Sequence, residues 1–124
     1  MSWLAVGAGA AIGAWLRWGL GMWLSNAHAQ VQAGTLAANL AGGYLIGIAL
    51  GFFSASPHLS PEWRLFVVTG FLGGLTTFSS FSGESVALMQ RGEFGWALAH
   101  TVLHLLGSIL LCIAGFATWR AFRG

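Results

Sequence analysis

Four long stretches of this chain carry no charged side chain: residues 1–16, 18–61, 65–83 and 94–119. A helix needs about 20 largely apolar residues to cross the hydrocarbon core of a bilayer. Turn-forming and polar residues interrupt the apolar sequence at 25–32, 54–62 and 90–93. We therefore expect a single all-α membrane domain over residues 1–124, with four transmembrane helices near residues 3–24, 35–54, 63–89 and 94–121. Because the connections are short, helices that follow one another should run antiparallel.

The scarcity of charge excludes several classes of protein. Charged residues make up 6% of the chain and apolar residues 56%, whereas roughly a quarter of the residues of a soluble domain are charged. The five basic residues are all arginine and the three acidic ones all glutamate, which is too few for a nucleic-acid-binding face. Cys112 is the only cysteine, so we expect neither an internal disulfide nor a multi-thiolate metal site.

The first span has one feature of a signal peptide, because Ala27, His28 and Ala29 have the small-x-small form of a cleavage site. Its start lacks the Lys or Arg residues of such a peptide, and Arg17 interrupts its apolar run. We therefore expect the first span to be retained.

Small and polar residues recur every four positions in three of the expected helices. These ridges are Gly9, Gly13, Arg17 and Gly21; Thr35, Asn39, Gly43, Gly47 and Gly51; and His100, His104, Ser108 and Cys112. In lipid, small residues let helix backbones approach closely, and polar side chains must face protein or water. We interpret the glycines as packing positions. Arg17 has two interpretations, since it either snorkels to the membrane surface or serves a water-filled cavity.

The third span should be interrupted near its middle. It holds Gly70, Gly73 and Gly74, followed by a run of Thr and Ser residues, and each glycine inside a helix costs about 1 kcal/mol relative to alanine. An interruption at membrane depth frees carbonyl and amide groups, which are tolerated only where protein or an ion satisfies them. Phe78 and Phe81 follow on one helical face, and the positive edge of a phenyl ring can face an anion. The segment therefore predicts an ion site.

Three segments together resemble the Fluc (CrcB) family of bacterial fluoride channels. They are Gly-Ala-Trp-Leu-Arg at 13–17, Gly-Thr-Leu-Ala-Ala-Asn-Leu-Ala-Gly at 34–42, and residues 70–81 with Glu84. The resemblance extends over the whole chain in length and in the layout of the spans. It implies a fluoride-selective channel, not an enzyme, that exports fluoride passively through the cell inner membrane and so confers fluoride resistance.

The resemblance also implies a role for individual residues. Asn39 matches a pore-lining amide donor, and Phe78 and Phe81 match two rings that contact permeating fluoride. The backbone carbonyls of Gly73 and Thr76 match those that hold a structural sodium ion at the centre of an antiparallel homodimer. Polar groups beside the pore are expected at Ser79, Ser80 and Glu84, a basic residue near the vestibule at Arg17, and a polar track along the fourth helix at His104 and Ser108. The roles of His100 and Cys112 stay open.

The arginines add an expectation about orientation and assembly. Arg64, Arg120 and Arg123 should lie on the side of the N-terminus, and Arg17 and Arg91 on the opposite side. An excess of Lys and Arg sets the orientation of a membrane protein, and three against two is almost no excess. We expect insertion in both orientations, and the family resemblance implies an antiparallel homodimer in which the small-residue ridges of the two copies pack together.

Two other functions are compatible with a chain of this kind. A small four-helix multidrug or cation exporter needs a membrane-embedded carboxylate in its first span, where this chain has Arg17. A haem-binding membrane subunit needs histidine ligands on facing helices, whereas His100 and His104 lie one turn apart on one helix and His28 and His58 lie in loops.

Overall fold

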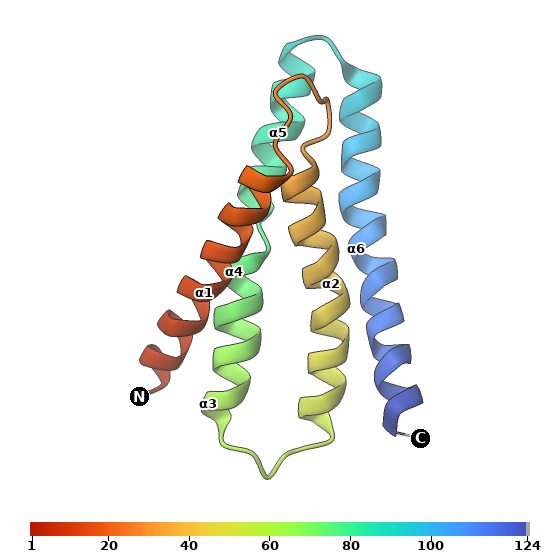
Figure 1. The fold of residues 1–124 in the computed structure, drawn as a ribbon. Helices are drawn as coiled ribbons and strands as arrows, with labels where there is room; N and C mark the ends of the chain where they lie inside the picture. Colours follow the sequence, from red (N-terminus) through yellow and green to blue (C-terminus); the bar gives the residue numbers. More distant parts are fainter. Residues whose placement is uncertain (124) are drawn as a thin grey trace.

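The computed structural model describes residues 1–123, which contain helices and no strand. The elements are α1 (Ser2–Trp23), α2 (Ala33–Ser54), α3 (Pro61–Arg64), η1 (Leu65–Leu72), α4 (Gly73–Leu75), α5 (Phe78–Gln90) and α6 (Phe94–Arg123). In Figure 1 the elements from α3 to α5 follow one another as a single interrupted column, and both termini lie at the same end of the molecule. The all-helical prediction is therefore confirmed, with boundaries within a few residues of those expected.

Three of the helical segments are long and apolar enough to cross a membrane. They are Ala33–Ser54, Pro61–Gln90 and Phe94–Arg123. Helix α1 has 22 residues, enough for a span, but its glycines, tryptophans and Arg17 make it less apolar. The chain is thus a multi-pass membrane protein, and a crossing by α1 stays a prediction.

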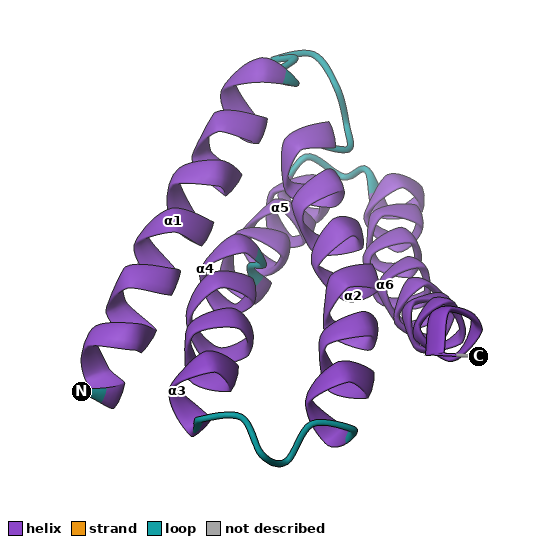
Figure 2. Ribbon diagram, turned by 60° about the horizontal axis from the view of Figure 1, so that its bottom comes forward, coloured by secondary structure: helices purple, strands orange, loops and turns teal. Residues whose placement is uncertain are grey.

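Helix α1 lies beside the first half of the interrupted column, as Figure 2 shows from a second direction, and glycines allow the close approach. A Cβ atom added to Gly70 would lie 2.7 Å from the carbonyl oxygen of Val6, and one added to Gly74 would clash with the carbonyl oxygen of Ala10. A Cβ atom added to Gly13 would likewise clash with the carbonyl oxygen of Phe71. These glycines are helical, and the interruption comes after them, at Thr76 and Thr77. The sequence predicted the right segment, but close packing rather than chain breaking explains Gly70 and Gly74.

The ridge of α2 packs on the ridge of α6 within the same chain. A Cβ atom on Gly43 would lie 2.7 Å from the carbonyl oxygen of Ser108, and one on Gly47 would clash with that of Cys112. The expectation that the ridges of two copies pack against each other is therefore wrong for these positions, because each ridge already has a partner helix in its own chain.

Candidate functional site

The interruption of the third column is two residues long. Thr76 (φ −87°, ψ 159°) and Thr77 (φ −149°, ψ 122°) are extended, so the backbone leaves the helix after Leu75 and re-enters it at Phe78. The Thr77 side chain caps α5, because its Oγ1 accepts a hydrogen bond from the Ser80 amide at 3.1 Å. Threonine is a favoured N-cap residue, which explains why a helix restarts at this point of the sequence.

Asn39 on α2 holds the extended segment in place. Its Oδ1 accepts a hydrogen bond from the Thr77 amide at 2.7 Å, and its Nδ2 donates to the Thr77 carbonyl at 3.0 Å. The side-chain amide thus satisfies both backbone groups of Thr77, which the interruption would otherwise leave unpaired in the membrane. These two bonds also fix which end of the amide is oxygen and which is nitrogen.

The orientation of Asn39 determines the protonation of His104. Asn39 Nδ2 lies 3.0 Å from His104 Nδ1, and an amide nitrogen can only donate, so Nδ1 is the acceptor. A neutral imidazole with an accepting Nδ1 carries its proton on Nε2. His104 Nε2 is buried and has no hydrogen-bond partner among the described residues. The site therefore contains a buried N–H donor that the described residues leave without an acceptor.

Arg17 points inward from α1. Its Nε donates to the carbonyl oxygen of Gly74 at 3.1 Å, one of the last carbonyls before the interruption. The C-terminal end of a helix carries partial negative charge and unpaired carbonyls, so a guanidinium group is a suitable partner. Of the two interpretations from the sequence, snorkelling to the surface does not describe this side chain.

Two further carbonyls at the interruption have no such partner. No hydrogen bond to the carbonyl oxygen of Gly73 or of Thr76 is found among residues 1–123, because the amides that would reach them bond elsewhere: the Thr77 amide to Asn39 and the Ser80 amide to Thr77. Gly73 is also exposed, and a Cβ atom there would make only an ordinary contact, 3.7 Å from the Val68 carbonyl oxygen. These two carbonyls are available to a ligand.

A hollow of about 410 Å³ brings most of the predicted residues together. Its lining includes Asn39, Gly73, Thr76, Phe78, Phe81, His104 and Ser108. Arg17, Ser79, Ser80 and Glu84 are not part of this lining. Ser79 is exposed and its hydroxyl lies 3.3 Å from that of Thr77, while Glu84 lies one helical turn beyond Phe81.

The two phenylalanines have different environments. Their ring centroids are 5.4 Å apart, but Phe78 is 73% exposed and Phe81 only 7%. Phe81 stacks on His100 with centroids 5.2 Å apart and contacts His104 at 4.9 Å. In this chain, therefore, Phe81 is packed between α5 and α6, while Phe78 projects outward.

Glu84 belongs to a hydrogen-bond network that the sequence did not predict. Glu84 Oε2 accepts from the Thr35 hydroxyl at 2.6 Å, and Glu84 Oε1 lies 3.1 Å from His100 Nε2. His100 Nδ1 in turn lies 2.8 Å from the Ser85 hydroxyl. His100 is fully buried. The polar ridges in the sequence included Thr35 and His100. The ridges did not indicate that α2 and α6 both contact Glu84 on α5.

Comparison with known proteins gives consistent matches over nearly the whole chain. Residues 4–116 match the model of a family described as CrcB-like protein, Camphor Resistance (CrcB). The chain is similar to a protein named fluoride-specific ion channel FluC of Pseudomonas putida (strain W619), with 60% identity over 121 residues, or 98% of this chain and 95% of that protein. Proteins of the same name from Cupriavidus pinatubonensis (56% over 120 residues, 97% and 95%) and Polynucleobacter asymbioticus (54% over 123 residues, 99% and 98%) are similar to it as well.

Proposed function

The chain belongs to the CrcB-like protein family, and we propose that it is a fluoride-selective channel, and not an enzyme, that lets fluoride leave the cell passively. The main structural support is the hollow at the interrupted helix. Its lining includes Asn39, Phe78, Phe81, His104 and Ser108. Neither a multidrug exporter nor a haem-binding subunit has support from the relatives or from this hollow.

The chemistry of the hollow suits a small anion. Helix α5 begins beside it, and the N-terminus of a helix carries partial positive charge and free amide donors. The His104 Nε2–H group adds a neutral donor, and phenyl ring edges carry weak positive charge. Neutral donors replace part of the water around an anion without binding it too tightly for release. Fluoride is strongly hydrated, so a set of aligned donors matters more for it than for larger halides.

We propose further that two copies assemble as an antiparallel homodimer in the inner membrane, with α1 as a fourth span. The ring of Phe78 projects from the subunit, and Gly73 and Phe78 form an open side of the hollow. A second copy would cover a phenyl ring and two carbonyls that a single chain leaves exposed. The near balance of three arginines against two supports insertion in both orientations, which an antiparallel pair requires.

We also propose that a sodium ion lies at the centre of this dimer. The unpaired carbonyls of Gly73 and Thr76 would meet those of the second copy where the two interrupted columns cross. Carbonyls without a partner cost several kcal/mol each in the membrane, and neutral oxygen ligands suit a monovalent cation, because a divalent ion normally requires carboxylates. The cation would have a structural role, holding the two interruptions against each other.

Growth of a fluoride-sensitive bacterium tests the function as a whole. A strain that lacks fluoride exporters of its own should grow in added fluoride when it expresses this chain and fail to grow with an empty vector. Growth that is equal with and without the chain, at verified expression in the membrane, would contradict the proposal.

A further inference from the structure

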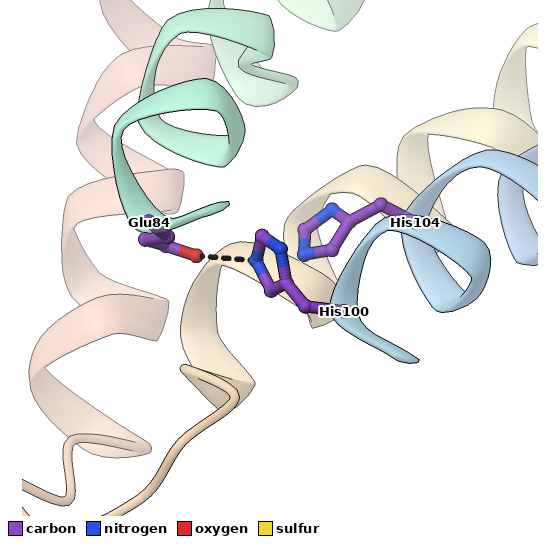
Figure 3. A group of neighbouring side chains, drawn as sticks. All are labelled: Glu84, His100 and His104. Carbon is purple, nitrogen blue, oxygen red and sulfur yellow. Dashed lines mark hydrogen bonds and ion pairs between the residues drawn. The ribbon is translucent and has the colours of Figure 1, made fainter. Parts of the chain in front are cut away.

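Two histidines on α6 and a glutamate on α5 lie close together (Figure 3), and one of them, His104, lines the hollow. Glu84, His100 and His104 each offer one ligand atom, and these atoms all lie within 4.8 Å of one another. Both histidines are buried, at 0% and 3% exposure, and Glu84 is partly open. Three potential metal ligands therefore converge from two neighbouring helices.

The donor set and its spacing are those of zinc-type sites. His100 and His104 lie at positions i and i+4 of one helix, the spacing by which two histidines bind zinc on one helical face. Two imidazoles and one carboxylate, with a fourth position open to water, form a recurrent three-ligand zinc arrangement. Metal–ligand bonds of about 2.0–2.1 Å in a tetrahedron place ligand atoms roughly 3.3 Å apart, and His100 Nε2 and Glu84 Oε1 are already 3.1 Å apart.

The partners around these ligands allow His100 to change tautomer. Ligating histidines usually donate their second ring N–H to a neighbouring group, and His100 Nδ1 lies 2.8 Å from the Ser85 hydroxyl. When His100 Nε2 donates to Glu84, Ser85 donates to Nδ1. When Nε2 binds a metal, Nδ1–H donates to Ser85, whose own proton can turn to the Thr101 hydroxyl, 3.5 Å away. Thr35 holds the other oxygen of Glu84 in either case.

His104 can bind the metal through Nε2 only if its proton moves. With Asn39 donating to Nδ1, the proton is on Nε2, and no lone pair is available there. Ligation through Nε2 shifts the proton to Nδ1, which then faces the N–H of Asn39 and repels it. Metal binding is therefore coupled to release of the contact between His104 and Asn39, the residue that holds Thr77.

From this geometry we propose that Glu84, His100 and His104 form a binding site for a transition-metal ion of the Zn²⁺ class. The ion enters from the partly open side of Glu84. Its binding pulls His104 from Asn39 and shifts the two imidazole rings against which Phe81 packs. Bound metal should therefore block the fluoride flux, a consequence that rests on the proposed function, whereas the binding itself does not.

Titration of the purified full chain in detergent with Co²⁺, a coloured substitute for Zn²⁺, tests the binding. The wild type should develop the visible absorption of tetrahedral Co²⁺ at one ion per chain, and Zn²⁺ should displace it. Glu84→Gln and His104→Ala should lose the band. The double variant His28→Ala/His58→Ala, which removes the two exposed loop histidines, should keep it. No band in the wild type, or a band that only the loop variant loses, would overturn the proposal.

Two variants that retain all three ligands test the site by their Co²⁺ affinity, even if a ligand variant fails to fold. Ser85→Ala removes the orienting partner of His100 and should weaken Co²⁺ binding by about 10–100-fold. Asn39→Asp replaces a donor by an acceptor for His104 Nδ1–H, which frees the Nε2 lone pair, and should tighten binding by about tenfold, as the gain of roughly one hydrogen bond implies. Unchanged affinity in both variants contradicts the site. If Co²⁺ binds as expected while Zn²⁺ leaves fluoride flux unaffected, the predicted block of flux is wrong, but the metal-binding site is supported.

Discussion

Asn39 uses both its amide hydrogens and its oxygen inside the subunit. The oxygen and one hydrogen bond to Thr77, and Nδ2 also reaches His104. The family resemblance implies an amide donor that faces the pore, whereas the contacts describe a residue that fixes the interrupted backbone and the tautomer of His104. We therefore expect Asn39 to act on the ion through the groups that it positions.

Asn39→Asp should therefore reduce fluoride flux by about tenfold or more, which corresponds to about 1.4 kcal/mol of added barrier. The change puts a negative charge at the hollow and replaces the donor to the Thr77 carbonyl by a repelling oxygen. Asn26→Asp is the matched control, since it makes the same change in a loop, where the Asn26 oxygen only accepts from the His28 amide. Equal flux in the two variants would place Asn39 outside the pathway.

The two phenylalanines allow flux and stability to be separated. Phe78→Ile and Phe81→Ile both remove an aromatic edge and should each lower fluoride flux by about tenfold. Only Phe81 is packed between α5 and α6, so only Phe81→Ile should also destabilise the fold, by about 1–2 kcal/mol. Flux in liposomes and thermal unfolding in detergent measure the two effects. Wild-type flux in both variants would mean that the rings are ordinary packing residues.

The sequence predicted residue types better than residue contacts. Glu84 was expected beside the pore from the family resemblance. The sequence singled out Asn39 and Arg17 because polar groups in a membrane span need partners. It could not identify the Thr77 backbone, the Gly74 carbonyl or His100 as those partners. Each of these contacts joins residues far apart in the chain, so it depends on which helices are neighbours.

The ends of the helices were predictable from the sequence, whereas the π-helix and the role of the glycines in packing were not. Charges and turn residues placed all four helical segments within a few residues. The π-helix η1 over Leu65–Leu72 has no distinct signal in its apolar sequence, although such turns are often found near functional sites. The glycines of the third span indicated the interrupted segment, but Gly70 and Gly74 are required by the approach of α1.

Substitutions at Gly74 and Gly83 form a matched pair that tests the packing of α1 on α4. Gly74→Ala places a methyl group against the backbone of Ala10 and should cost about 1–3 kcal/mol through overpacking, while moving the Gly74 carbonyl away from Arg17. A Cβ atom on Gly83 has nothing within 4 Å, so Gly83→Ala should be neutral or stabilise α5 by up to about 1 kcal/mol. Thermal unfolding of both variants distinguishes them, and equal stability would contradict the packing of α1 on α4.

For the whole molecule, the placement of both termini at one end agrees with an even number of crossings. The open side of the hollow and the unpaired carbonyls of Gly73 and Thr76 are the features that a single chain leaves incomplete. The proposed antiparallel dimer and its sodium ion complete both features at once, which is why assembly and ion content should depend on each other.

Removal of sodium tests this dependence. Purification with a large organic cation in place of sodium should lower the dimer fraction and the fluoride flux together, because the facing carbonyls lose their ligand. Return of sodium should restore both. Size-exclusion chromatography with light scattering measures the dimer, and a sodium assay verifies the removal. A dimer that keeps its stability and flux without sodium would refute the central cation.

Fluoride efflux from liposomes measures the proposed channel activity itself. Purified chain is reconstituted into vesicles loaded with fluoride or, in parallel, with chloride, and halide-selective electrodes follow the release after the membrane potential is dissipated. We expect rapid fluoride release, chloride release no faster than from protein-free vesicles, and a strong reduction of fluoride release by Phe81→Ile. Fluoride release no faster than from protein-free vesicles, or equal release of the two halides, would contradict the proposed channel activity.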